Sequence, residues 1–228
     1  AATGYTQPHR REGQGPMTGL LIKALIAYLV GSVSGSMVMG KVRQVDIRKS
    51  GSGNAGGTNA FRTQGFSFAL AVVIIDIGKG VLAASLVPML NMGPLGDALS
   101  REGQAMVCGL MAVVGHCYPV WYGFRGGKGA ATAVGALLVI GPPVIVPMLI
   151  VWVLTLVLTG WVGLATILAA ITMVPAFIWL DASASGVWFS VILAAFIVFM
   201  HRSNIRNLLN GTENRFEKIR VANWFKRD

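Results

Sequence analysis

The sequence predicts an all-α integral membrane protein, a seven-transmembrane-helix bundle with glycine-rich cytoplasmic loops. Only 12% of its 228 residues are charged and 54% are hydrophobic, whereas soluble domains carry about 25% charged residues. Several apolar runs approach the roughly 20 residues that a helix needs to cross a bilayer. We expect helices in these runs, because backbone polar groups in lipid must be hydrogen bonded within their own segment.

The candidate spans, in chain order, are residues 18–40, 66–91, 104–121, 129–143, 144–160, 163–180 and 185–200. Two breaks divide 129–180, one at the helix-disrupting Pro142–Pro143 pair and one at "TGWVG", residues 159–163. If 129–160 instead forms one kinked helix, the chain has six spans. Residues 17–203 are the predicted transmembrane domain. A disordered lead or cloning remnant is expected at 1–16, and a cytoplasmic tail at 204–228.

The charge distribution orients the predicted bundle. The net charge is +10, and the lysines and arginines lie in short segments between apolar runs. This pattern suits anionic membrane lipid and argues against nucleic acid. Most of these residues follow the first span, the third span or residue 200, so they share one side of a seven-span protein. The positive-inside rule makes that side cytoplasmic, which leaves the N-terminus outside and the C-terminus in the cytoplasm.

The tail "RFEKIRVANWFKRD", residues 215–228, mixes aromatic and basic residues. Such a segment can form a helix that lies among the lipid headgroups. An ordinary charged, partly disordered tail is the alternative.

A first polar island, "SGSGNAGGTNAFR" at residues 50–62, is rich in glycine and contains no acidic residue. Glycines let successive backbone N–H groups turn inward and form a nest that binds anions. Hydroxyl and amide side chains add donors, and Arg62 adds a planar, charged fork. This inventory suits a phosphate, and a flexible loop is the plainer alternative.

A second island, "GFRGGKGAAT" at residues 123–132, leads into an apolar run. A helix N-terminus that follows glycines and Lys128 can bind a phosphate. The segment is not a Walker A loop, because Tyr122 and Gly129 stand where that loop needs glycine and Ser or Thr. A nucleoside triphosphatase is therefore disfavoured.

A third island, "HRSNIRNLLNGTEN" at residues 201–214, follows the last span. His201 and Asn204 are three residues apart, so one helical turn would place both on one face. A neutral histidine can accept a proton, and a cationic one can bind an anion. For His201, and for His116 at the cytoplasmic end of the third span, a histidine at headgroup level is the alternative.

Two charged residues, Asp76 and Lys79, fall inside the second span, where isolated charges are costly. Their spacing favours a structural ion pair that faces the bundle interior over direct contact with substrate. The three islands share one side of the protein, and two of them resemble separate phosphate sites. Together they suggest transfer of a group between two phosphorylated substrates.

The islands also carry a family resemblance. "DIRKSGSGNAGGTNAFRTQG", "DIGKG", "GHCYPVWYGFRGGKGAAT" and "HRSNIRNLLNGTEN" occur in this order between about residues 27 and 215. They closely resemble the bacterial acyl-phosphate-dependent glycerol-3-phosphate acyltransferases, integral-membrane enzymes of the bacterial inner membrane that begin phospholipid synthesis. The resemblance implies a seven-helix bundle with a cytoplasmic active site. It implies acyl transfer from acyl phosphate to the sn-1 hydroxyl of glycerol 3-phosphate, giving lysophosphatidic acid and inorganic phosphate. It also implies a soluble phosphate acyltransferase as the partner that supplies acyl phosphate.

The resemblance assigns roles residue by residue. The residues that match essential positions, and that we predict to be catalytic, are Ser52, Arg62, Lys128, His201 and Asn204. The predicted substrate contacts are Gly53, Asn54, Gly57, Thr58 and Asn59 for the donor phosphate, Gly126, Gly127 and Gly129 for the phosphate of glycerol 3-phosphate, and His116 and Thr166. Glu213 is expected to be structural, like Asp76 and Lys79. No cofactor or metal is expected, because an acyl phosphate is already activated.

Some positions depart from the family pattern. "GLAT", residues 163–166, replaces a common Ser-Leu-x-Ser, so Thr166 keeps a hydroxyl and Gly163 does not. Gly57 replaces a more usual alanine or threonine, and Asn207 a frequent arginine.

The mechanism and the alternatives follow from the same residues. No Ser-His-Asp set is evident, so we expect direct attack by the alcohol, with a donor phosphate oxygen or His201 taking its proton. A lipid acyltransferase with a His-x4-Asp motif is excluded by the absence of that motif. The alternative function is a membrane transporter for a phosphorylated metabolite, but the repeated halves with interrupted helices typical of transporters are not apparent.

Overall fold

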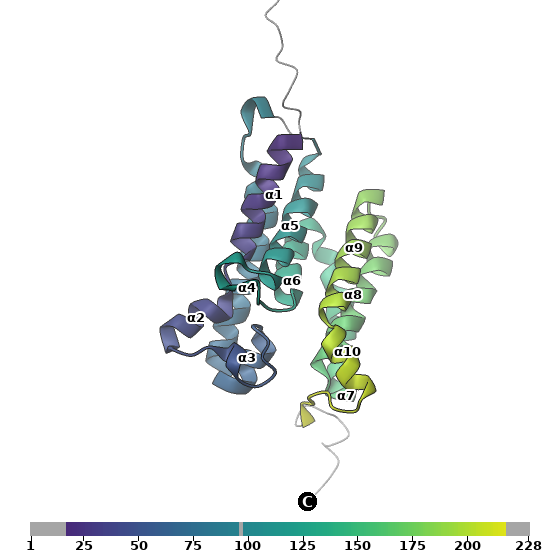
Figure 1. Ribbon diagram of the computed structural model, residues 1–228. Coiled ribbons are helices and arrows are strands. Elements are labelled where there is room, and N and C mark those ends of the chain that lie inside the picture. Colours follow the sequence, from purple (N-terminus) through teal and green to yellow (C-terminus); the bar gives the residue numbers. More distant parts are fainter. Residues whose placement is uncertain (1–16, 96–97, 218–228) are drawn as a thin grey trace, which may run out of the picture.

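The computed structural model describes residues 17–95 and 98–217, and all regular elements in these ranges are helical (Figure 1). The α-helices are α1 (Met17–Gly31), α2 (Gly35–Arg43), α3 (Gly57–Gln64), α4 (Phe66–Ser85), α5 (Arg101–Cys117), α6 (Ala130–Ile140), α7 (Ile145–Thr159), α8 (Val162–Trp179), α9 (Ala184–Met200) and α10 (Arg202–Leu209). Short 3₁₀ turns lie at 47–49, 87–89, 93–95, 120–122 and 142–144. The predictions for 1–16, and for the tail beyond residue 217, lie outside the described residues.

Five segments of the described chain are long and apolar enough to cross a membrane, and a sixth qualifies if the bent pair α9 and α10 is one span. The five are Met17–Arg43, Phe66–Met89, Arg101–Tyr122, Pro142–Thr159 and Val162–Trp179. Helix α6 has 11 residues, so it extends only about 16 Å, roughly half of a hydrocarbon core. The all-helical class is confirmed, and the count of seven spans stays a prediction.

Both predicted breaks within 129–180 are confirmed. Helix α6 ends at Ile140 and α7 begins at Ile145, on either side of a turn at 142–144. Helix α7 ends before Gly160, whose φ is +77°, and α8 begins two residues later. Residues 129–160 therefore form two helices rather than one kinked helix.

The predicted span at 18–40 matches the candidate span Met17–Arg43, but the helix is interrupted inside it. The helix stops at Gly31, and α2 begins at Gly35. The carbonyl of Val33 accepts a hydrogen bond from Lys79 Nζ at 2.8 Å. Because a continuous helix would use that carbonyl internally, the buried lysine accounts for the break.

The helices form two groups that a shared core joins. Helix α4 packs against α1, α5 and α6, and α8 packs against α7 and α9; Figure 1 shows the groups side by side. The largest core cluster includes Val113 of α5, Leu137 of α6, Met173 and Phe177 of α8, and Leu193 of α9. This cluster fixes the position of the second group against the first.

Glycines allow helix backbones to touch within the first group. A Cβ added to Gly80 of α4 would lie 2.2 Å from the carbonyl oxygen of Thr132 in α6. A Cβ at Gly115 of α5 would lie 2.2 Å from the carbonyl oxygen of Tyr28 in α1. Such contacts are expected in membranes, where helices associate by close packing because lipid is as apolar as leucine.

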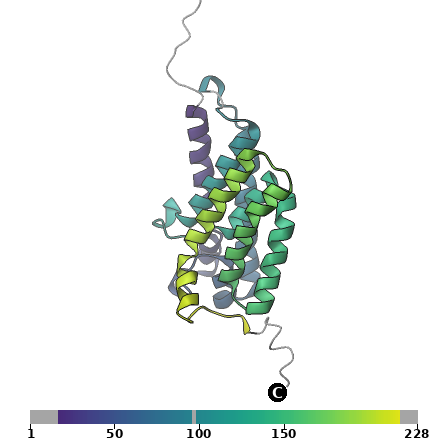
Figure 2. The ribbon, with the colours of Figure 1, turned by 90° about the vertical axis from the view of Figure 1, so that its right-hand side faces the viewer.

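The polar islands gather at one end of the bundle. Figures 1 and 2 both show α3 of the first island and α10 of the third at the lower end, opposite the start of α1. Lys128 and Gly129 of the second island line the same cavity as residues of the other two. The described chain therefore begins at one end of the bundle and finishes at the other. This arrangement agrees with the expectation that the three islands share one side.

We predict that Gly80→Ala lowers the thermal unfolding temperature of the detergent-solubilised protein. The added methyl group would push α4 and α6 apart, and overpacking of this kind costs about 1–3 kcal/mol. The control is Gly78→Ala in the same helix, where an added Cβ meets no atom within 4 Å. There alanine should be neutral or stabilising, by up to about 1 kcal/mol of helix propensity. Equal melting temperatures for the two variants would contradict the contact.

Candidate active site

A cavity of about 290 Å³ lies where the three polar islands meet. The first island contributes its loop and α3, the second contributes the start of α6, and the third contributes α10 and the loop after it. Residues of α4, α5, α7 and the start of α8 complete the wall. The polar side chains around the cavity belong to Ser52, Asn54, Thr58, Asn59, Arg62, Asp76, His116, Lys128, Trp152, Thr166, His201, Ser203, Asn204, Asn207, Glu213 and Asn214.

One buried amide shapes the first island. Asn59 Oδ1 accepts a hydrogen bond from the backbone N–H of Ser52 at 2.9 Å. Asn59 Nδ2 donates to the carbonyls of Ile47 and Ser50, at 2.9 and 3.1 Å. Gly51 has a φ of +60°, and a Cβ there would lie 2.2 Å from Asn59 Oδ1. The loop therefore closes around Asn59, whose predicted contact with substrate stays a prediction.

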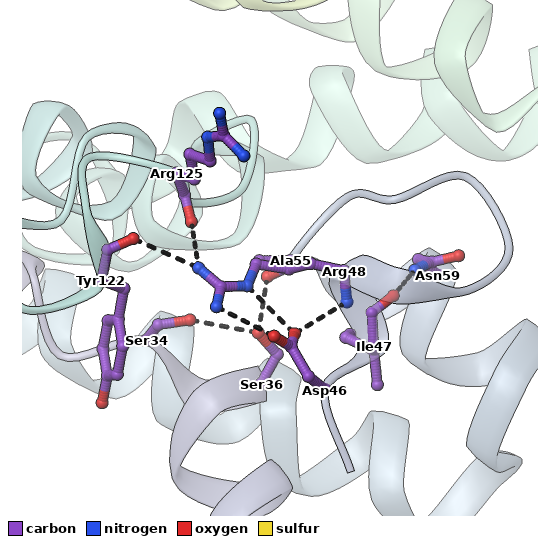
Figure 3. A network of polar contacts seen from close by, with 9 residues as sticks. All are labelled: Ser34, Ser36, Asp46, Ile47, Arg48, Ala55, Asn59, Tyr122 and Arg125. Carbon is purple, nitrogen blue, oxygen red and sulfur yellow. Dashed lines mark hydrogen bonds and ion pairs between the residues drawn. The ribbon is translucent and has the colours of Figure 1, made fainter.

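Arg48, two residues before the first island, contacts the loop in which the second island begins (Figure 3). Arg48 Nη2 lies 2.9 Å from Asp46 Oδ2 in an ion pair. Its Nη1 donates to the carbonyls of Tyr122 and Arg125, at 3.2 and 3.3 Å. The hydrogen bond from the Arg48 side chain is the main cause that lowers the pKa of the Asp46 carboxyl. Because the ion pair is partly exposed, it contributes little stability by itself. It orients the Arg48 side chain, whose bonds to Tyr122 and Arg125 link the two loops.

A chain of polar contacts joins the second island to the third. Lys128 Nζ donates to Ser203 Oγ at 3.1 Å and also to Asn204 Oδ1. Asn204 Nδ2 donates to Glu213 Oε1 at 2.7 Å. A Cβ at Gly163 would lie 2.6 Å from Asn204 Nδ2. The glycine that departs from the family pattern thus leaves the space that the asparagine amide fills.

Two cations line the cavity outside the membrane-spanning helices. Arg62 Nη2 donates to the Asn214 carbonyl at 3.5 Å, and its guanidinium lies 4.6 Å from the centre of the Phe216 ring. Burial lowers the pKa of Arg62, and the Glu213 carboxylate opposes this effect. Burial likewise lowers the pKa of Lys128. Both cations are half-buried at the cavity wall, where their attraction for an anion is stronger than in bulk water.

The two cavity histidines have different partners. His201 Nδ1 lies 2.8 Å from the carbonyl oxygen of Ile197. A carbonyl only accepts, so Nδ1 carries the proton and the neutral ring keeps Nε2 as an acceptor. His116 Nδ1 instead lies 2.8 Å from Lys79 Nζ. The predicted ion pair of Lys79 and Asp76 is confirmed, with Nζ and Oδ1 2.9 Å apart in the bundle interior.

An apolar cavity of about 360 Å³ adjoins the polar one. The two share Val73, Ala130, Ala131, Trp152 and Thr166 as lining residues. Beyond this shared wall the lining is almost wholly aliphatic, with α6, α7, α8 and α9 contributing side chains. Thr166 Oγ1 donates to the Val162 carbonyl and accepts from Trp152 Nε1.

A third, basic cavity of about 310 Å³ shares Asn54, Lys128 and Ser203 with the polar one. The charged residues on its wall are Arg125, Lys128, Arg202 and Arg206.

The structure brings most predicted site residues together. The polar cavity is lined by all five predicted catalytic residues, by Asn54, Gly57, Thr58, Asn59, His116, Gly129 and Thr166 of the predicted contacts, and by Asp76 and Glu213. Gly126 and Gly127 line the basic cavity instead. Gly53 lines neither of these two cavities, and Lys79 lies behind His116. The roles assigned to these residues stay predictions.

Sequence reasoning missed Trp152, Ser203, Asn207 and Asn214 as lining residues. Trp152 lies in a uniformly apolar run, which offers no local signal. Ser203 and Asn207 lie four residues apart in the third island, a spacing that places both on one helix face and could have indicated them.

Known proteins share this fold and much of this sequence. The family model described as "Glycerol-3-phosphate acyltransferase" matches residues 21–211. The chain belongs to this family. A glycerol-3-phosphate acyltransferase of Chlorobaculum parvum is 40% identical, over 83% of this chain and 93% of the relative. One of Symbiobacterium thermophilum is 40% identical, over 87% of this chain and 96% of the relative.

Two solved structures extend the likeness to three dimensions. They are crystal structures of PlsY, an integral membrane glycerol 3-phosphate acyltransferase, in a glycerol 3-phosphate form and a lysophosphatidic acid form. Each has a TM-score of 0.76, with 31% and 32% identity. They cover 91% and 89% of this chain, and 99% and 98% of their own. With the apolar helices described above, they make this chain a multi-pass membrane protein.

We predict that Asn59→Asp destabilises the first island. A carboxylate at this position would face the carbonyls of Ile47 and Ser50, which only accept, at a cost of about 1–3 kcal/mol. The control is Asn54→Asp in the same loop, because Asn54 makes no side-chain hydrogen bond to the described residues. The thermal unfolding temperature in detergent should fall for Asn59→Asp and not for Asn54→Asp. The shaping role of Asn59 is refuted if both variants melt like the unsubstituted protein.

Proposed function

We propose that this protein transfers a fatty acyl group from acyl phosphate to the sn-1 hydroxyl of glycerol 3-phosphate. The products are lysophosphatidic acid and inorganic phosphate, in the first step of phospholipid synthesis. One observation carries the proposal: a cavity with cations from different islands shares a wall with an apolar cavity. The glycerol 3-phosphate and lysophosphatidic acid forms of the related PlsY structures support the acceptor and the product.

Acyl phosphate suits the site because the site offers places for two phosphates. The first island presents the exposed Ser52, the amide of Asn54 and the guanidinium of Arg62 to one side of the cavity. Lys128 and the start of α6 lie on the other side. We assign the donor phosphate to the first island and the phosphate of glycerol 3-phosphate to the second. A soluble phosphate acyltransferase would supply the donor.

The apolar cavity suits the acyl chain. Its aliphatic lining can hold a chain out of water, and a chain bound there would end beside a phosphate bound in the polar cavity, because the two cavities share a wall. The acyl carbonyl would then lie near Thr166 and Trp152, where the two cavities join.

The reaction proceeds by direct attack in this account. The sn-1 hydroxyl oxygen bonds to the acyl carbon, and the bond from that carbon to the phosphate oxygen breaks. Arg62 and Lys128 neutralise the negative charge that develops as phosphate leaves, and the cavity holds the reactants together. The hydroxyl proton passes to His201 Nε2, which is an acceptor in the neutral ring, or to an oxygen of the donor phosphate.

The orientation follows from charge. We place the islands on the cytoplasmic side of the bacterial inner membrane, with the N-terminus outside. The gathering of α2, α3 and α10 at one end, with basic residues in the loops between them, supports this placement.

The donor is tested with protein in lipid, glycerol 3-phosphate and palmitoyl phosphate. We expect equal amounts of lysophosphatidic acid and inorganic phosphate. Arg62→Ala should lower the rate about 100-fold or more, as loss of one charge-stabilising group does in other enzymes. The control is Arg43→Ala, which removes an exposed arginine at the end of α2, outside the cavity. It should leave the rate unchanged.

Two outcomes would overturn the proposal. If acyl-CoA reacts and palmitoyl phosphate does not, the donor assignment is wrong. If neither reacts and glycerol 3-phosphate crosses the bilayer, the protein is a transporter.

The pKa of Lys128 predicts a pH dependence. Because burial lowers this pKa, the cation is lost as the pH rises through a value below the usual lysine pKa of about 10.4. The kcat/KM for glycerol 3-phosphate should therefore fall at alkaline pH, since this ratio reports on groups of the free enzyme. Lys128→Arg keeps its charge over the whole range, so its decline should begin at higher pH. Coincident pH profiles would exclude Lys128 as the titrating group.

A further inference from the structure

A buried polar cluster lies behind the proposed reaction cavity, between α4 and α5. Asp76 and Lys79 belong to α4, and His116 lies near the end of α5. Their exposed fractions are 1%, 4% and 2%. Asp76 Oδ1 also accepts a hydrogen bond from the backbone N–H of Gly35 at 3.1 Å. The cluster is thus nearly buried, although Asp76 and His116 reach the wall of the polar cavity, and most of its polar groups are satisfied within the protein.

Lys79 is the donor of the cluster. Its Nζ lies 2.9 Å from Asp76 Oδ1, 2.8 Å from the Val33 carbonyl oxygen and 2.8 Å from His116 Nδ1. An ammonium group has three N–H donors and no acceptor, which matches three neighbours. The contact with His116 therefore requires a lone pair on Nδ1. In the neutral ring the proton then belongs to Nε2.

The competing arrangement fits less well. His116 Nδ1 also lies 3.4 Å from Asp76 Oδ1, and a proton on Nδ1 could point there. That distance is 0.6 Å longer than the contact with Lys79, and the proton would oppose an ammonium at 2.8 Å. The shorter contact therefore favours the tautomer with its proton on Nε2.

Nε2 of His116 faces the second island. A Cβ on Gly127 would lie 2.1 Å from this nitrogen, so only glycine leaves it room. His116 lines the polar cavity together with Lys128 and His201. Among the described residues, Nε2 has no hydrogen-bond partner. A donor without a partner at the wall of a cationic cavity suits a phosphate oxygen.

We propose that Lys79 and Asp76 are positioning residues that hold His116 in its Nε2–H form, so that His116 donates to a substrate phosphate. His201 has the opposite form, with its proton on Nδ1 and Nε2 as an acceptor. The cavity thus contains one histidine that donates and one that accepts. The identity of the phosphate as a substrate group rests on the proposed function.

Nuclear magnetic resonance with ¹⁵N-histidine tests the tautomers directly. The chain has three histidines, so the spectrum contains few ring nitrogens, and His9→Gln and His116→Gln assign them. We expect a protonated Nε2 and a bare Nδ1 in His116, and the reverse in His201. Inorganic phosphate should shift the His116 Nε2 signal. A protonated Nδ1 in His116, or no response to phosphate, would overturn the proposal.

The positioning role is tested with Lys79→Met. Asp76 then becomes the nearest neighbour of Nδ1, and because a carboxylate only accepts, Nδ1 should gain a proton. The control is Lys23→Met, which removes another fully buried lysine, far from His116, that donates to Pro88 and Gln104. The control should leave the His116 signals unchanged. An unprotonated Nδ1 in Lys79→Met would refute the role of Lys79. If this variant does not fold, the spectrum of the unsubstituted protein still tests the tautomer.

Phosphate affinity tests the donor itself. The amide of His116→Gln reaches the place of Nε2, whereas the amide of His116→Asn reaches only the place of Nδ1. We expect the Kd of inorganic phosphate to rise less than about threefold in His116→Gln. In His116→Asn it should rise about 10-fold to 100-fold, as for loss of a hydrogen bond to a charged group. An equal loss of phosphate affinity in the two variants would contradict donation from Nε2.

Failure of this inference can be told apart from failure of the proposed function. The tautomers and the response to phosphate are measured with no acyl donor present. If the tautomers and the phosphate response are as expected but palmitoyl phosphate yields no product, the proposed donor is wrong and the inference stands. If product forms and the tautomer is the opposite one, only the inference fails.

Discussion

The buried ammonium of Lys79 is the contact on which the arrangement of the islands depends. It binds the Val33 carbonyl where α1 has ended, and it shares Asp76 with the first N–H of α2. It also contacts His116 at the end of α5, just before the second island. Charges inside an apolar bundle are costly unless they are paired. One cation therefore fixes α2, and with it the first island, relative to the second.

Under the proposed function, this arrangement would let an amphiphilic donor meet a polar acceptor. The polar cavity contains Arg62 and Lys128, and the apolar cavity begins at Trp152 and Thr166. An acyl phosphate would have its charge in the first cavity and its chain in the second, with the reactive carbonyl between them. The protein then needs to supply only position and charge, because the mixed anhydride is already activated.

Local chemistry was readable from the sequence, and tertiary contacts were not. The breaks at 142–144 and at Gly160 were predictable because proline and glycine act on their own turn. The polar cavity was foreseen largely because each island is contiguous in sequence. The break after Gly31 was missed because it depends on Lys79, 46 residues from Val33. The link from Arg48 to Tyr122 and the place of Trp152 likewise depend on packing.

Isotope exchange tests the central claim, that the acyl group passes directly from acyl phosphate to the hydroxyl of glycerol 3-phosphate. Palmitoyl phosphate and labelled inorganic phosphate are incubated with the protein, without glycerol 3-phosphate. Direct transfer predicts that no label enters palmitoyl phosphate, while the same preparation makes lysophosphatidic acid once glycerol 3-phosphate is added. Label in palmitoyl phosphate without the acceptor would show that an acyl group rests on the protein, for example on Ser52, and would contradict the account.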